Sequence, residues 1–199
     1  MKKKRVAILG FMDSWKRAPW EDYDYEIWCM NQFELYAIPR YDRWFDMHTW
    51  FNLITRPVGK ELFKRRKVSS HVHWLSKHCE VPIYMPKKYN MIKNSIAYPI
   101  EKMLKIHGPV FTNTVDYEIA LAVEEGFKEI QIYGIAMQGI DEIWQQRNSL
   151  SYFVGYAKGK GVDVYIPSNH NFLRINQIYG YNTKNIEPYW KYLNSNQTM

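Results

Sequence analysis

Three ionisable side chains are candidates for acid or base chemistry: Asp46, His48 and His170. All three are expected close to strand ends, where catalytic groups of parallel α/β proteins gather. Histidine exchanges protons near neutral pH, so His48 or His170 is a candidate general base, and Asp46 is a further candidate acid or base. A structural role for each histidine is the alternative.

A second group of glycine and small polar residues could hold a nucleotide and its phosphates. Asparagine carries donors and an acceptor that can contact a base edge or a sugar hydroxyl, and the hydroxyls and amides of a helix start can hold an anion. Arginine can neutralise phosphate. The alternatives are local turns and helix caps. The candidates are Gly10, Asp13, Ser14, Asn31, Thr112, Asn113, Thr114, Gly134 and Arg147.

Several familiar cofactor and metal motifs are missing. ILGFMDSW, residues 8–15, has one glycine where a dinucleotide fingerprint needs two or three, which argues against an ordinary NAD site. His71, His73, His78 and Cys79 match no standard zinc spacing. There is no nucleophile elbow, Walker loop or paired-cysteine motif. We therefore expect no bound metal and no resident cofactor.

Composition favours a single intracellular domain. The chain has 199 residues, enough for one full core, and two cysteines, too few for a disulfide framework. No signal peptide or long apolar segment is recognised, which predicts a soluble cytoplasmic protein without a membrane span. The net charge of +7, part of it in Lys60 and residues 64–67, favours anionic partners such as nucleotides, nucleic acids or acidic sugars. A solvated basic surface is the alternative.

Short apolar runs separated by helical segments predict the elements that position these residues. A buried strand, 5–9, ends at Gly10, and the helix after Asn113 ends at Gly126 before another strand. We expect strands at 5–9, 26–30, 43–47, 81–85, 129–133 and 162–166, and a second helix at about 141–158. The region 52–80 is expected to be a basic insertion, and the tail from about 168 to be partly irregular.

This alternation predicts an α/β fold: a Rossmann-like, doubly wound, mainly parallel sheet with helices on both faces. In such sheets, ligands bind beyond the carboxyl ends of the strands. The candidate residues follow strands or begin helices, so we expect them to meet along one edge of the sheet.

Four segments resemble glycosyltransferase family 42 sialyltransferases and the related motility-accessory-factor and pterin-pyrophosphokinase-like domains. They are KKRVAILG, WCMNQF, FTNTVDYEIALAVEEGFKEIQIYGIAM and VDVYIPSNHNFL, in the family's order. The chain also looks similar to small stand-alone proteins of this type that are associated with bacteriophage genomes. GFMDSW stands where the family has a loop rich in glycine and asparagine.

The resemblance implies a Rossmann-like fold that holds a cytidine nucleotide sugar as co-substrate. Asn31 and residues 112–114 would contact it. A histidine base would assist a metal-independent displacement. The leading hypothesis is therefore a nucleotide-sugar-dependent glycosyltransferase, whose acceptor could be nucleic acid or another anionic molecule. A non-catalytic protein that sequesters a nucleotide or signalling molecule, and a nucleic-acid-binding module, are the alternatives.

Overall fold

The computed structural model describes residues 4–55, 68–137, 139, 145–167 and 172–173. A seven-stranded sheet has the order β5-β4-β3-β2-β1-β6-β7, and all its neighbouring strands are parallel. The strands are β1 (Arg5–Leu9), β2 (Tyr25–Met30), β3 (Arg43–Phe45), β4 (Ile83–Met85), β5 (Ser95–Ala97), β6 (Glu129–Tyr133) and β7 (Asp163–Tyr165). The expected Rossmann-like class is confirmed.

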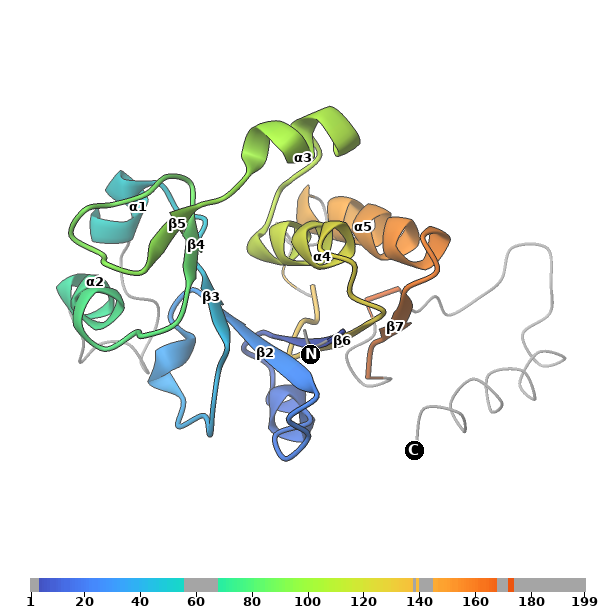
Figure 1. The fold of residues 1–199 in the computed structure, drawn as a ribbon, viewed down its shortest axis with the longest axis horizontal. Coiled ribbons are helices and arrows are strands. Elements are labelled where there is room, and N and C mark those ends of the chain that lie inside the picture. The colour runs from blue at the N-terminus through green and yellow to red at the C-terminus, as the bar shows by residue number, and fades with distance from the viewer. Residues whose placement is uncertain (1–3, 56–67, 138, 140–144, 168–171, 174–199) are drawn as a thin grey trace, which may run out of the picture.

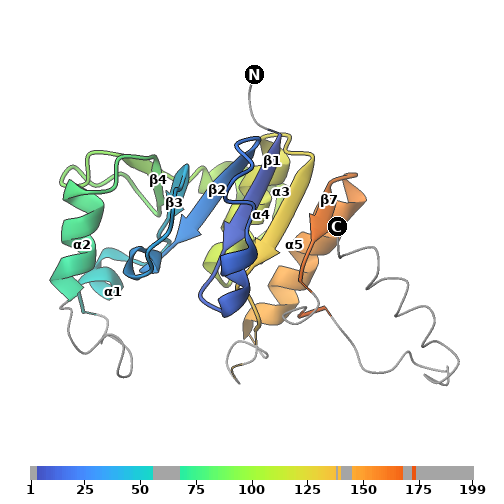
Figure 2. The ribbon, with the colours of Figure 1, turned by 90° about the horizontal axis from the view of Figure 1, so that it is seen from below.

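Helices cover both faces of this sheet (Figures 1 and 2). They are α1 (Trp50–Thr55), α2 (Val68–Lys77), α3 (Ile100–His107), α4 (Thr114–Glu124) and α5 (Arg147–Gly159), with short 3-10 helices η1 (Asp13–Arg17) and η2 (Phe33–Leu35). No helix in these ranges is long and apolar enough to cross a lipid bilayer.

Alternation along β1 explains the two layers of core. Val6 and Ile8 pack in a cluster with side chains of α4 and α5. Ala7 and Leu9 belong to the other cluster, with residues of α1, α2, η1 and η2. Successive side chains of a strand point to opposite faces, so an uninterrupted apolar strand such as β1 supplies both clusters.

The order in which strands are added to the sheet reverses at β1: β2 to β5 lie on one side of it, and β6 and β7 lie on the other. Leu9 pairs with Cys29 of β2 on one side and with Tyr133 of β6 on the other. The carboxyl ends of these three neighbouring strands therefore lie at the same edge of the sheet. The topological switch point lies between β1 and β6. This places the loops after β1, β2 and β6 together.

The expected strands at 5–9 and 129–133 have the predicted bounds, whereas β3, β4 and β7 are shorter than predicted. The sequence interpretation missed β5 and α3. The expected start of the last helix, Asp141, lies outside the described residues, as do residues 56–67 of the expected basic insertion and most of the tail.

Candidate functional site

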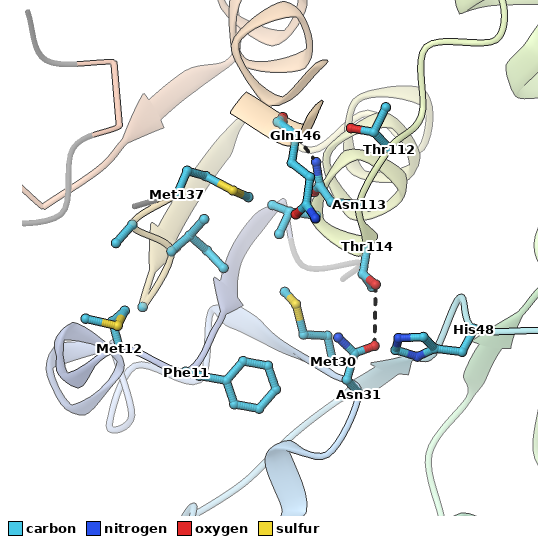
Figure 3. A pocket seen from close by; sticks show the side chains of 14 residues that line it. Phe11, Met12, Met30, Asn31, His48, Thr112, Asn113, Thr114, Met137 and Gln146 are labelled. Atoms are coloured by element: carbon cyan, nitrogen blue, oxygen red, sulfur yellow. Dashed lines mark hydrogen bonds between the residues drawn. The ribbon is translucent and has the colours of Figure 1, made fainter. Parts of the chain in front are cut away.

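A cavity of about 430 Å³ opens at the carboxyl ends of β1, β2 and β6 (Figure 3). Six segments of the chain meet around it. Its lining consists of Phe11, Met12, Met30, Asn31, His48, Thr112, Asn113, Thr114, Val115, Gly134, Ile135, Ala136, Met137 and Gln146. The expected convergence of Asn31, His48, Gly134 and residues 112–114 is therefore present.

The cavity has an apolar and a polar side. Phe11, Met12 and Met137 lie on one side, and Asn31, His48 and the start of α4 lie on the other (Figure 3). Flexible methionines and an aromatic ring adapt to flat apolar ligands, whereas the amides and hydroxyls opposite can bind polar groups. This distribution suits an amphipathic ligand that carries both an aromatic and a polar part.

Two glycines form the tight junction between β1 and β6 behind the cavity. The Gly10 amide donates to the Tyr133 carbonyl at 2.8 Å, and the Met12 amide donates to the Gly134 carbonyl at 3.0 Å. A Cβ atom on Gly10 would lie 2.6 Å from the Gly134 oxygen. Gly134 also has a φ of 71°, which favours glycine. Gly10 therefore permits close backbone approach and does not line the cavity.

Asn31 turns the chain at the end of β2 and connects it to α4. Its φ is 50°, a left-handed conformation in which asparagine is enriched. Its backbone is held by Phe45 and Trp44, and its Oδ1 accepts a hydrogen bond from the Thr114 hydroxyl at 3.4 Å. Figure 3 shows this contact and the Asn31 amide nitrogen pointing away from Thr114.

Backbone strain is concentrated at this cavity. Within the described ranges, the non-glycine residues with positive φ are Asn31 and Met137, the latter at 49°, and both line the cavity. Such conformations are unfavourable and persist where the surrounding structure enforces them, which occurs most often at functional sites.

The start of α4 has a complete capping box. The Asn113 side chain accepts from the Asp116 amide at 3.2 Å, and the Asp116 carboxylate accepts from the Asn113 amide at 3.3 Å. Asp116 also accepts from the Thr112 amide at 2.9 Å. Thr112 and Ser149 share a hydrogen bond that joins α4 to α5. The cap fixes an N-terminus whose positive dipole end faces the cavity.

Two buried acids of α4 are biased toward their neutral forms. Burial raises the pKa of Asp116 to about 6, although hydrogen bonds from Thr112, Ser149 and Asn113 oppose the shift. Burial also raises the pKa of Glu118 well above its usual value. Neither of its carboxyl oxygens has a hydrogen-bond partner among the described residues. Asp116 is still mostly ionised at neutral pH, so it is the shift of Glu118 that reduces the negative charge near the N-terminus of α4 and makes this end of the helix more favourable for an anion.

His48 extends from the loop after β3 toward Asn31 (Figure 3). Its Nδ1 lies 2.8 Å from Oδ1 of Asp46, which is 1% exposed. Burial alone would raise the pKa of Asp46, but hydrogen bonds from His48 and His71 lower it to about 2. A carboxylate acceptor holds the proton of neutral His48 on Nδ1, so that Nε2 carries the lone pair. The pair has the geometry of a general base with an orienting acid.

Three further candidates, Asp13, Ser14 and Arg147, are not among the residues that line the cavity. Asp13 is exposed and pairs with Lys16 at 2.8 Å. Ser14 is buried and accepts from the Gly134 amide at 2.7 Å, which fixes the loop after β1 to the end of β6. Arg147 begins α5, next to the lining residue Gln146. His170 lies outside the described residues.

The sequence interpretation did not assign functional roles to three side chains near this cavity. Phe11 and Met12 are exposed and line it, although large apolar side chains on a loop give only a weak signal. His71 hydrogen bonds to Asp46 behind His48. Within the described ranges, no group of three or more His, Cys, Asp or Glu residues could hold a metal ion.

Comparisons of the sequence and the fold with known proteins give different results. No protein-family model matches the sequence. No curated protein matches it either. The fold, however, is similar to solved structures of sialyltransferases.

One of them is the sialyltransferase CstII from Campylobacter jejuni in complex with a substrate analogue, CMP-3FNeuAc. It has 17% sequence identity and a TM-score of 0.57, over 90% of this chain and 88% of that chain. Another is the monofunctional alpha-2,3-sialyltransferase Cst-I from Campylobacter jejuni, with 14% identity and a TM-score of 0.52 over 98% and 96% of the two chains.

A third is a complex of CST-II with a trisaccharide acceptor and CMP, at 14% identity and a TM-score of 0.51 over 90% and 88% of the two chains. At such identities the likeness shows a shared fold, over most of both chains. These structures do not bear on the expected similarity to bacteriophage proteins.

Proposed function

We propose that this protein is a glycosyltransferase that takes a sugar from a cytidine nucleotide donor bound in the strand-end cavity. The observation that carries the proposal is that His48, which is paired with the buried Asp46, lines the same cavity as Asn31 and the start of α4. The structural neighbours support the choice of donor, because their complexes contain CMP or CMP-3FNeuAc.

The donor would use both sides of the cavity. We place its base against the apolar side formed by Phe11, Met12 and Met137. Its phosphate would lie at the N-terminus of α4, where helix amides and the Thr114 hydroxyl can donate hydrogen bonds. The Asn31 amide would contact the base or the ribose.

Sugar transfer would proceed by displacement of the nucleotide. An acceptor hydroxyl oxygen forms a bond to the anomeric carbon, while the bond from that carbon to the phosphate oxygen breaks and CMP leaves with its electron pair. His48 Nε2 takes the hydroxyl proton, and Asp46 stabilises the imidazolium that results. Such assistance contributes about 10²- to 10⁴-fold to a reaction rate.

We propose a sugar hydroxyl as the acceptor. The support for this choice is that one structural neighbour forms a complex with a trisaccharide acceptor. The sequence interpretation also considered nucleic acid, on the basis of Lys60 and residues 64–67, which lie outside the described residues.

The test is incubation of the protein with CMP-linked and UDP-linked sugars, with and without oligosaccharide acceptors, followed by chromatography of the released nucleotide and product. We expect release of CMP, faster with acceptor, and a loss of about 10²-fold or more in His48→Gln. His73→Gln is the matched control, because His73 is an exposed histidine elsewhere on the fold. Stoichiometric capture of CMP-sugar without turnover would contradict the enzyme and favour a sequestering protein.

A further inference from the structure

His48 and Asp46 belong to a chain of four side chains in contact, which continues through His71 to Glu34. Asp46 Oδ2 lies 2.8 Å from Nε2 of His71, and His71 Nδ1 lies 2.8 Å from Oε1 of Glu34. Together with the 2.8 Å contact from His48 to Asp46, three contacts lead from the cavity into the interior. The residues are contributed by η2, by α2 and by the loop after β3.

This chain of contacts is shielded from solvent beyond His48. The side chains of Asp46, His71 and Glu34 are 1%, 3% and 4% exposed, whereas that of His48 is 24% exposed. A small cavity of about 10 Å³, enough for about one water molecule, adjoins Asp46, His48 and His71 and shares Asn31 with the larger cavity. His48 and Asn31 line both cavities and thus connect these buried residues to the candidate site.

The hydrogen-bond roles determine the charge of His71. Ionised carboxylates only accept hydrogen bonds, so an imidazole placed between two of them must donate from both nitrogens. His71 is then an imidazolium between the Glu34 and Asp46 carboxylates, and this group of three carries one net negative charge. That charge lies directly behind His48.

The acid–base properties of the cluster agree with this charge assignment. Burial alone would lower the pKa of His71, but hydrogen bonds to Asp46 and Glu34 raise it to about 9. Two further titratable groups influence the cluster electrostatically, Cys79 near Glu34 and Tyr89 near Asp46. Burial raises the pKa of Cys79 to about 12 and also raises the pKa of Tyr89, so both are uncharged at neutral pH.

We propose that His71 and Glu34 are positioning residues for the general base: they fix the Asp46 carboxylate, and through it the orientation and tautomer of His48. The proposal rests on the proposed function for its catalytic meaning. Asp46 must present Oδ1 to His48. Its other oxygen, Oδ2, is held by the His71 imidazolium, which is held in turn by Glu34. Without that cation, a buried aspartate would tend to bind a proton or rotate.

The first test measures the imidazole rings of the unliganded full-length protein by ¹⁵N-detected NMR across pH 5 to 10. We expect both nitrogens of His71 to carry protons at pH 7.5, and neutral His48 to carry its proton on Nδ1. Glu34→Gln should lower the pH at which His71 loses its second proton by at least one unit, which is tenfold in proton affinity. A neutral His71 at pH 7.5 in the parent protein would overturn the proposal.

The second test separates positioning from stability. In His71→Gln we expect His48 to populate both neutral tautomers, kcat for CMP release to fall 10- to 100-fold and KM for the donor to change less than threefold. His73→Gln, on the exposed side of the same helix, should change none of these quantities. If His71→Gln does not fold, Glu34→Gln replaces it, with a smaller loss of kcat, a KM for the donor that changes less than threefold, and both neutral tautomers of His48 populated.

Failure of this proposal and of the proposed function can be distinguished. A folded His71→Gln protein whose His48 keeps the Nδ1 proton and the parent kcat would show that His71 is only a stabilising residue. If the parent protein releases no CMP but the ring spectra are as expected, the chain of contacts stands and the assigned reaction is wrong.

Discussion

The Thr114 hydroxyl lies 3.4 Å from the amide oxygen of Asn31, although the two residues are 83 positions apart in the chain. This contact joins the end of β2 to the first residue of α4 across the candidate donor site. It is the specific juxtaposition that the strand-end hypothesis required. The parallel register of β1 with β2 and β6 explains it, because these strands end at one edge.

Asn31→Gly should weaken CMP binding without impairing folding. Glycine adopts the positive φ of this position at no steric cost, so the variant removes the side-chain amide alone. One lost hydrogen bond of about 0.5–1.5 kcal/mol corresponds to a roughly 2- to 10-fold weaker Kd. Isothermal titration calorimetry with CMP measures the effect, and an unchanged Kd in the folded variant would exclude Asn31 from the donor site.

Gly10→Ala should destabilise the fold and disturb the cavity. The added Cβ would lie 2.6 Å from the Gly134 oxygen, which is backbone and cannot move without separating β1 from β6. We expect a loss of about 1–3 kcal/mol or more in the free energy of unfolding, as for overpacked interiors. Gly155→Ala is the control, because Gly155 is exposed within α5 and an added Cβ would meet no atom within 4 Å beyond the nearby backbone of the helix itself.

For Gly155→Ala we expect a gain of up to about 1 kcal/mol, since alanine favours a helix over glycine. Urea unfolding followed by circular dichroism measures both variants. Equal stabilities of Gly10→Ala and the parent protein would show that the β1–β6 junction relaxes easily.

Several elements could be predicted from the sequence because their signals are local. β1 is an unbroken apolar run closed by glycine, and α4 begins with a capping box within the four residues 113–116. β5 has only three residues and one of them is a buried serine, so no apolar run marks it. α3 follows Pro99 without a side-chain cap, which left its start without a signal.

The gathering of Asn31, His48 and residues 112–114 could also be predicted, because a general rule places ligands at the ends of parallel strands. The role of His71 could not. In the sequence it stands near His73, His78 and Cys79, a spacing that suggested only a weak zinc alternative. Its partners Glu34 and Asp46 are 37 and 25 positions away, and their approach depends on how α2 packs.

The buried Asp116 makes stability depend on pH. Its pKa is about 6 in the folded protein, against an ordinary value of 3.8. Between these values the folded state binds more protons than the unfolded state, so this contribution is complete below pH 3.8 and is lost as pH rises through 6. From pH 4 to pH 7 we expect the parent to lose roughly 2 kcal/mol relative to Asp116→Asn.

Urea unfolding of the parent protein and Asp116→Asn at pH 4, 5, 6 and 7 measures this difference. Other groups with shifted pKa values, among them Glu118 and His71, also titrate partly within this range, but both proteins contain them, so their contributions cancel in the difference. A constant difference between the two proteins across the series would show that the Asp116 pKa is not raised by burial.

His48→Gln should separate donor binding from sugar transfer. The Kd for CMP should change less than threefold, because we place the nucleotide on Asn31 and α4. The rate of CMP release in the presence of acceptor should fall about 10²- to 10⁴-fold, as expected for the loss of a general base. Calorimetry and a single-turnover assay supply the two quantities. Equal rates in His48→Gln and the parent protein would assign the base to another residue.

The most direct test is diffraction from crystals soaked with an equimolar mixture of CMP, UMP, AMP and GMP. We predict density for cytidine in the cavity beyond β1, β2 and β6, with its phosphate at the N-terminus of α4 and the Asn31 amide within hydrogen-bond distance. A nucleotide bound elsewhere on the protein, or an empty cavity at millimolar nucleotide, would contradict the account.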